Sequence, residues 1–298
     1  MGATAAGKSR LALALASHLS IEIVSVDSAQ VYRGLDIGTA KPSAAEQAAV
    51  PHHLIDLRDP SQPYSAADFC TDALKTIDDV LARGRIPLLV GGTMLYFRAL
   101  RDGLADLPSA DATTRAQIAN VVRYTGSAGL HAWLANVDPI TAARLHVNDP
   151  QRIQRALEVF LVSGRPLSQH LESSPKTLQT KLPCRLVQLA IGPKQRRDLD
   201  DVIGRRVLRM LAHGLVEEVR QLKARGDLSP DLPAMRAVGY RQVWEFLEGR
   251  IDHEHMVSAI VKATQHLAKR QYTWLRAWSG LQWCNDPSPE EVALFLTG

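Results

Sequence analysis

The sequence predicts an α/β fold, a parallel sheet flanked by helices, with a helical insertion. A glycine-rich turn leads into a helical stretch at the amino terminus, and short β-branched runs then alternate with helical patterns. Residues 113–172 show helical patterns and no strand pattern. Strands that alternate with helices form parallel sheets. We therefore expect an α/β core at 1–112, a helical insertion at 113–172, and the completion of the core with carboxy-terminal helices at 173–298.

The composition is that of a globular protein. Of the 298 residues, 46% are hydrophobic and 22% are charged, which excludes a disordered, collagen-like or coiled-coil chain. No apolar run reaches the length of a membrane span. The three cysteines are far apart and form no CxxC pair, which is typical of a reducing compartment and excludes a disulfide scaffold. We expect a cytoplasmic monomer that has no membrane contact.

The first element is a phosphate-binding loop. Residues 2–9 match G-x-x-x-x-G-K-[ST], the P-loop, in which backbone amides and a helix amino terminus hold a phosphate group. Lys8 supplies a positive charge, and Ser9 supplies a hydroxyl ligand for Mg²⁺. The sequence thus predicts a P-loop NTPase-like sheet. The predicted diphosphate- or nucleotide-binding residues are Gly2, Ala3, Thr4, Ala5, Ala6, Gly7, Lys8 and Ser9.

The strand that should precede this loop has no counterpart in the sequence. A P-loop ordinarily follows a buried strand, and Met1 alone stands before Gly2. We therefore expect the first strand of the sheet to be missing from this chain. Either the start codon is assigned too late, which we favour, or the protein folds with a gap.

Two strands separated by a helix come next. Ile21–Val26 and Arg85–Val90 are apolar runs of strand length, and residues 66–83 have helical spacing. Ligands of parallel sheets bind at the carboxyl ends of the strands. Asp27 and Thr93, which follow these two strands, should therefore lie beside the P-loop.

The remaining elements are helical apart from one strand. Residues 113–172 carry several helical patterns with polar faces, and Leu186–Ile191 returns as a strand. Residues 195–225 and 234–278 are predicted to be long helices. Residues 149–298 hold 22 Lys and Arg against 17 Asp and Glu, a net charge of +5. This excess of positive charge favours a polyanionic partner.

The end of the second strand indicates the kind of chemistry. Gly91-Gly92-Thr93 stands where most P-loop nucleotidases carry an acidic magnesium ligand, and Asp27 is the remaining strand-end carboxylate near the loop. The bound phosphate therefore fits a leaving group better than a phosphoryl donor. A P-loop small-molecule kinase or NTPase is the alternative. A third hypothesis is an RNA-binding protein with a disabled P-loop.

Several motifs resemble those of the tRNA dimethylallyltransferase (tRNA isopentenyltransferase) family, bacterial type. They follow in collinear order at residues 25–32 (SVDSAQVY), 37–42 (IGTAKP), 51–56 (PHHLID), 87–96 (PLLVGGTMLY), 148–158, 206–219, 238–241 (VGYR) and 269–276 (KRQYTWLR). The resemblance implies transfer of a dimethylallyl group from dimethylallyl diphosphate to the exocyclic N6 amine of adenosine 37 of tRNA, beside the anticodon. Diphosphate leaves, and Mg²⁺ is the implied cofactor. Prenylation of free adenylate is an alternative, but the insertion and the basic second half favour the tRNA anticodon stem-loop as partner.

The resemblance also implies roles for individual residues. Asp27 would accept the proton of the amine, and Arg206 would stabilise the charge of the departing diphosphate. Asp27 could instead cap a turn, and Arg206 could belong to a solvated basic helix face. Arg152 and Arg155 could equally be ordinary surface charges. The predicted tRNA-binding residues are Asp27, Ser28, Ala29, Gln30, Thr93, Arg115, Gln151, Arg152, Ile153, Gln154, Arg155, Arg236, Ala237, Val238, Gly239, Tyr240, Arg241, Lys269, Arg270 and Arg276.

Overall fold

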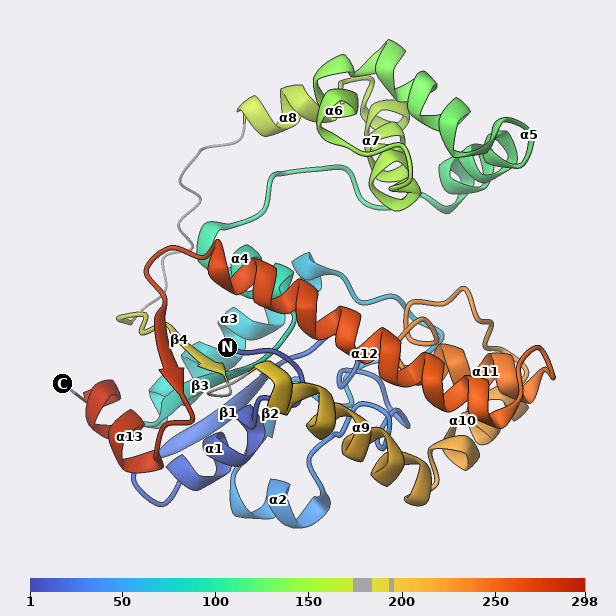
Figure 1. The fold of residues 1–298 in the computed structure, drawn as a ribbon. Coiled ribbons are helices and arrows are strands. Elements are labelled where there is room, and N and C mark those ends of the chain that lie inside the picture. The colour runs from blue at the N-terminus through green and yellow to red at the C-terminus, as the bar shows by residue number, and fades with distance from the viewer. Residues whose placement is uncertain (174–183, 193–195, 298) are drawn as a thin grey trace. The chain divides into compact units, whose positions relative to one another are not determined.

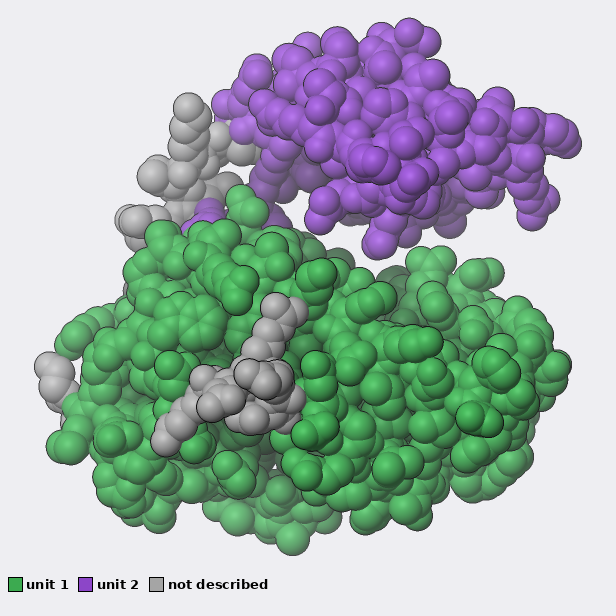
Figure 2. Space-filling view, in the orientation of Figure 1, with its two compact units in different colours: residues 1–101, 181–298 green, residues 102–180 purple. Residues whose placement is uncertain are grey.

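The structure is a computed structural model that describes residues 1–173, 184–192 and 196–297 (Figure 1). The chain forms two compact units, which Figure 2 distinguishes by colour. The first consists of residues 1–101 and 181–298, and the second of residues 102–180. The predicted insertion, 113–172, lies inside the second unit, whose boundaries fall further out at both ends.

The first unit is built on a parallel sheet in the order β2-β1-β3. Its strands are β1 (Ile21–Val26), β2 (His52–His53) and β3 (Ile86–Gly91). β1 is buried along its whole length, as expected for a strand that is covered on both faces. The predicted strands at 21–26 and 85–90 are confirmed, whereas β2 is too short to show a periodic pattern.

Side chains of β1 alternate between two hydrophobic clusters. Ile21 and Ile23 pack with α1 (Lys8–Leu15) and α13 (Pro289–Thr297). Val24 and Val26 belong to the larger cluster with α3 (Ala66–Ala82), α4 (Met94–Asp102) and α12 (His253–Arg276). Helices thus cover both faces of the sheet, and α2 (Ala44–Ala49) precedes β2.

A second, two-stranded parallel sheet consists of β4 (Leu189–Gly192) and β5 (Gln282–Asn285). The residues directly before the P-loop pair with β4. The amino group of Met1 donates a hydrogen bond to the Leu189 carbonyl at 2.8 Å, and Gly2 forms a parallel bridge with Ile191. Among the described residues, this short pairing occupies the position in which a strand ordinarily leads into a P-loop.

The helices of the carboxy-terminal half are shorter and more numerous than the sequence predicts. The helix predicted at 195–225 is two helices, α9 (Arg196–Ala212) and α10 (Leu215–Ala224). Gly214 lies between them at φ 97°, a left-handed conformation that ends one helix and begins the next. The helix predicted at 234–278 is likewise α11 (Tyr240–Leu247) followed by α12. Gly249, at φ 71°, separates these two.

The second unit is helical and has its own core. Its elements are α5 (Ala112–Val137), α6 (Pro139–Arg144), α7 (Pro150–Ser163) and α8 (Leu167–Ser173). α5 consists of two helical stretches that meet at a kink at Gly126 (φ 65°, ψ −172°). Asp138 and Asp149 cap α6 and α7, each followed by a proline in the first turn. The core residues include Ile118, Leu130, Leu134, Ile153 and Leu157.

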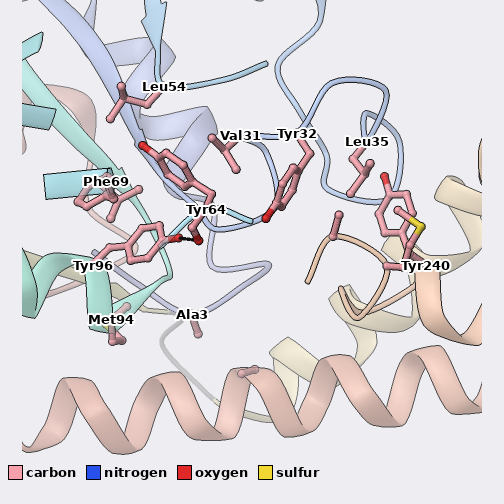
Figure 3. Close-up of a cluster of buried hydrophobic side chains, with 14 of the residues drawn as sticks. Ala3, Val31, Tyr32, Leu35, Leu54, Tyr64, Phe69, Met94, Tyr96 and Tyr240 are labelled. Atoms are coloured by element: carbon pink, nitrogen blue, oxygen red, sulfur yellow. Dashed lines mark hydrogen bonds between the residues drawn. The ribbon is translucent and has the colours of Figure 1, made fainter. Parts of the chain in front are cut away.

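An aromatic cluster supports the loop that follows β1. Phe69 and Tyr96 stack with their ring centroids 4.5 Å apart, and the Tyr96 hydroxyl donates to the Tyr64 carbonyl at 3.3 Å (Figure 3). Tyr32, from the loop after β1, is buried in the same cluster. The aromatic cluster therefore anchors the loop after β1 through the buried Tyr32 side chain. No described helix combines the length and the apolar character that crossing a bilayer requires.

Candidate active site

A cavity of about 670 Å³ lies at the carboxyl ends of the strands. Ligands of parallel α/β sheets bind in this position. The walls come from the P-loop, the segment after β1, the end of β3, and helices α9 and α12. The lining residues include Thr4 to Arg10, Asp27, Gln30, Thr39, Ala40, Gly91, Gly92, Arg206, Arg209, Gln271 and Asp286.

The P-loop adopts the curled backbone that its sequence predicts. Ala5 and Gly7 have φ values of 63° and 81°, and Gly7 caps the amino terminus of α1. Gly2 is required by a close approach, since a Cβ there would lie 2.6 Å from the Ile191 carbonyl oxygen. The first amides of a helix have no partner within that helix. The loop therefore presents backbone donors and the positive end of the α1 dipole to the cavity.

Lys8 lies within this cradle. Its Nζ donates a hydrogen bond to the Ala3 carbonyl at 2.5 Å. Burial lowers the pKa of Lys8 to about 8, the negative charge of Asp27 raises it, and the positive charge of Arg206 lowers it. The three side chains therefore act on one another electrostatically across the same cavity.

Asp27 is held in a fixed orientation directly after β1. Its Oδ1 accepts the backbone N–H groups of Ala29 at 2.8 Å and Gln30 at 3.3 Å. The Thr93 hydroxyl accepts the Ser28 N–H at 3.1 Å, which joins the ends of β1 and β3. Asp27 lines the same cavity as the P-loop, as predicted. Thr93 is joined to Ser28, the neighbour of Asp27, and is not among the residues that line the cavity. The turn-capping role considered for Asp27 is also present, on one of its two oxygens.

Arg206 reaches the cavity from α9. Burial lowers the pKa of its guanidinium, the charge of Asp27 raises it, and Arg209 lowers it. A guanidinium and an ammonium thus face the cavity together with the loop amides. This combination is suited to a polyanion, and a diphosphate has the charge and size to contact all of them.

Some residues of the cavity were absent from the sequence predictions. Gln271 lies in the KRQ run of α12, where only its basic neighbours suggested a role. Asp286 follows β5, a strand that the sequence pattern did not reveal, and Arg209 lies one turn from Arg206. Gln30 was predicted to contact tRNA. Its side chain accepts the Ser25 hydroxyl at 2.8 Å and donates to the Thr39 and Ala40 carbonyls, so it also shapes the cavity wall.

Among the arginines predicted in the second unit, two form ion pairs with a buried carboxylate. Glu158 is fully buried. Arg115 Nε lies 2.8 Å from its Oε1, and Arg155 Nη1 lies 2.7 Å from its Oε2. Burial works against the ionised form of Glu158, but the hydrogen bonds from these arginines outweigh it and lower the pKa.

The other predicted tRNA-binding residues of α7, at 151–154, differ in solvent exposure. Arg152 has 68% of its side chain exposed and lies 3.4 Å from Asp149. Gln151 is exposed and Gln154 is half-buried. Ile153 is fully buried in the core of the unit, so its side chain is not on the surface where the tRNA contact was predicted. Ile153 lies on the buried face of α7, between polar neighbours in the sequence.

The 236–241 segment divides in the same way. Arg236 and Arg241 are exposed, whereas Ala237 and Val238 are half-buried and Gly239 is buried. Tyr240 is fully buried, and its hydroxyl donates to Glu218 at 2.5 Å. The Tyr240 side chain is therefore not on the surface where the tRNA contact was predicted. Glu218 further accepts the Ile37 N–H at 2.7 Å, which fixes the loop that leads to Thr39 and Ala40.

The basic residues at the end of α12 and the tryptophan that follows this helix differ in solvent exposure. Lys269, Arg270 and Arg276 are exposed. Trp278, which follows the end of α12, is buried, and its indole N–H donates to Gln188 Oε1 at 2.8 Å. The exposed cations thus form a basic surface on a helix whose other face belongs to the core.

The carboxylates and histidines form no metal cluster within the described part of the chain. No three His, Cys, Asp or Glu side chains there are grouped so that they could hold a metal ion. His53 instead lies 2.6 Å from Glu22, and His52 contacts the Val50 carbonyl. The Ser9 hydroxyl at the start of α1 suits Mg²⁺, which commonly takes one or two protein ligands and completes its shell with substrate phosphates and water.

Comparison with known proteins gives consistent matches over the chain. A model of the IPP transferase family matches residues 30–278. The tRNA isopentenylpyrophosphate transferase of Bacillus halodurans is 36% identical, with a TM-score of 0.71 over 100% of this chain and 94% of that chain. The Staphylococcus epidermidis tRNA delta(2)-isopentenylpyrophosphate transferase is 31% identical, with a TM-score of 0.69 over 100% and 95% of the two chains. A eukaryotic dimethylallyltransferase acting on tRNA is 26% identical, with a TM-score of 0.76 over 96% and 73%.

Proposed function

Because the chain belongs to the IPP transferase family, we propose that it transfers a dimethylallyl group from dimethylallyl diphosphate to tRNA and releases diphosphate. The two bacterial relatives are tRNA isopentenylpyrophosphate transferases, and the eukaryotic one acts on tRNA. The observation that carries the proposal is one cavity in which the P-loop, Lys8 and Arg206 face the carboxylate of Asp27.

The cationic side of the cavity binds the diphosphate. As the bond between the allylic carbon and the diphosphate oxygen breaks, negative charge grows on the leaving group. The loop amides, Lys8 and Arg206 stabilise that charge in place, and such preorganised donors contribute more in the transition state than in the ground state. Ser9 is the residue that would hold Mg²⁺, which would neutralise part of the diphosphate charge when bound.

The acidic side of the cavity receives the nucleophile, which we propose to be the exocyclic N6 amine of adenosine 37. This amine is a weak nucleophile because its lone pair is delocalised into the adenine ring. The nitrogen forms a bond to the allylic carbon, the carbon–oxygen bond breaks, and the amine proton passes to Asp27. The contacts of Asp27 Oδ1 with the Ala29 and Gln30 amides orient its other oxygen for this acceptance.

The exposed cations provide the surface for the tRNA. We propose that Lys269, Arg270 and Arg276 of α12, Arg236 and Arg241, and Arg152 of α7 contact phosphates of the anticodon stem-loop. An adenosine in a loop is already unpaired, which lowers the cost of drawing it into a cavity. We expect the protein to act as a monomer in the cytoplasm.

Incubation of the protein with Mg²⁺, labelled dimethylallyl diphosphate and unmodified tRNA tests this function. We expect label on N6 of adenosine 37 after nucleoside analysis, and none on a matched tRNA that carries guanosine at position 37. Free adenylate serves as a second acceptor in a parallel reaction. Label on adenylate alone, or equal labelling of the two tRNAs, would contradict the proposed acceptor.

A further inference from the structure

The side chain of Gln271 joins two walls of the cavity. Gln271 is buried on α12, and its amide makes two hydrogen bonds. The Oε1 atom accepts the backbone N–H of Thr4 in the P-loop at 2.7 Å. The Nε2 atom donates to the backbone carbonyl of Gly92 at the end of β3 at 2.8 Å. One side chain therefore bridges the diphosphate cradle and the strand end that carries Thr93.

Gly92 makes this bridge sterically possible. A Cβ at position 92 would lie 2.3 Å from Gln271 Nε2 and 3.3 Å from the Gly2 carbonyl oxygen. A larger residue there would push the amide away from its carbonyl partner. The glycine is explained by this close approach, because its backbone needs no left-handed conformation.

The contact with Thr4 lies next to a strained residue of the P-loop. Ala5 has φ 63°, which is unfavourable for a residue with a Cβ and must be maintained by its surroundings. The hydrogen bond from Thr4 to Gln271 fixes the peptide that enters this turn. The conformation of the turn in turn decides where the following amides point.

The contact with Gly92 lies next to the part of the cavity proposed to receive the adenosine. Thr93 follows directly, and its hydroxyl accepts the N–H of Ser28, the neighbour of Asp27. An amide suits the bridge because it offers an acceptor and a donor at one end. A carboxylate has no donor for the Gly92 carbonyl, and a hydrocarbon of the same length has neither group.

We propose that Gln271 is a positioning residue of the transfer reaction, which sets the diphosphate cradle against the Asp27–Thr93 edge. This inference rests on the proposed function. Gln271 acts through the backbone of Thr4 and Gly92 and touches neither reacting atom. It also ties both sites to α12, the helix whose exposed cations we assign to tRNA.

Gln271→Met tests the proposal, with Gln265→Met on the same helix as the matched control. Gln265 is half-buried and does not line the cavity. We expect Gln271→Met to weaken the binding of inorganic pyrophosphate about tenfold and to lower kcat/KM for dimethylallyl diphosphate about 100-fold. The KM for tRNA should stay within twofold. Gln265→Met should match the wild type in all three quantities.

A double-mutant cycle tests the same bridge by changing Gly92, the partner of Gln271. The result does not depend on one variant folding well. Gly92→Ala should lower kcat/KM in the wild type by displacing the amide, and should have little further effect in Gln271→Ala, where the side chain is already gone. Independent, multiplying effects would overturn the proposal. So would a Gln271→Met protein whose pyrophosphate binding and kcat/KM equal those of Gln265→Met.

The two readouts separate this inference from the proposed function. A wild-type protein that transfers no prenyl group contradicts the function, while pyrophosphate binding by the Gln271 variants still decides whether the bridge positions the cradle. A wild-type protein that transfers the group, with Gln271 variants unchanged in both readouts, contradicts the inference alone.

Discussion

The two units of the molecule use positive charge in different ways. In the first unit, Lys8 and Arg206 face a cavity with the P-loop amides, and burial lowers the pKa of both. In the second unit, Arg115 and Arg155 close on the buried carboxylate of Glu158. The first arrangement is suited to an anion that arrives from solution, whereas the second already contains its anion. Basic residues that look alike in the sequence thus divide into those that face a cavity and those that pair with a buried carboxylate.

The largest expected effect concerns the carboxylate of the first unit. Asp27→Asn keeps an oxygen for the Ala29 amide but removes the proton acceptor. The single-turnover rate of prenyl transfer should therefore fall by about 10³. Filter binding should give an unchanged Kd for tRNA. A rate within threefold of the wild type would remove Asp27 from the mechanism.

The second prediction concerns the carboxylate of the second unit. Glu158→Gln leaves two arginines without their buried counter-charge, and should cost about 3 kcal/mol of the unfolding free energy of that unit. The pKa of Glu158 is lowered in the fold, so its contribution is complete above its unfolded value of about 4.3. That contribution is lost as the pH falls through the folded pKa.

Urea unfolding followed by Trp133 fluorescence reports on this unit when the other tryptophans are replaced. Pyrophosphate binding by the first unit is the control, and it should be unchanged in Glu158→Gln. Equal stability of variant and wild type at pH 7 would contradict the structural role of the ion pairs.

The third prediction is a pH dependence of pyrophosphate binding, which concerns the first unit. Lys8 has a pKa of about 8, so the ammonium is present below this pH and is lost above it. Pyrophosphate affinity should fall as the pH rises through about 8. Lys8→Met should weaken binding about tenfold at pH 7 and flatten the profile above it. A variant that retains the full wild-type pH profile would show that the titrating group is elsewhere.

The smallest effect concerns an arginine of the second unit outside the Glu158 cluster. Arg152→Ala should weaken tRNA binding severalfold and reduce the salt dependence of log K by about one. Arg144→Ala, an exposed arginine of α6, is the matched control and should change neither. If both variants behave alike, Arg152 is an ordinary surface charge.

The sequence predicted local elements better than it predicted contacts between elements, for a physical reason. β1, α3 and the P-loop are specified by local periodicity and by a contiguous motif, and each was predicted nearly to the residue. The partner of Arg115 is Glu158 on another helix, and no spacing rule connects the two. Gln271 was missed because its role depends on Thr4 and Gly92, which only the fold brings together.

The breaks in the carboxy-terminal helices were missed for a related reason. Helical periodicity continues on both sides of Gly214, so the pattern alone indicated one helix. The left-handed conformation of that glycine ends it. Likewise β5 is short and largely exposed, and neither alternation nor hydrophobicity distinguished it from a loop.

A direct comparison of two donors tests the central claim that the P-loop cavity holds a departing diphosphate. The wild type and Lys8→Met are each supplied with tRNA, Mg²⁺ and either labelled dimethylallyl diphosphate or γ-labelled ATP. We predict that the prenyl label enters the RNA with the wild type, that transfer drops sharply with Lys8→Met, and that no phosphoryl group is transferred. Hydrolysis or transfer of the ATP γ-phosphate, with no prenyl label in RNA, would contradict the account.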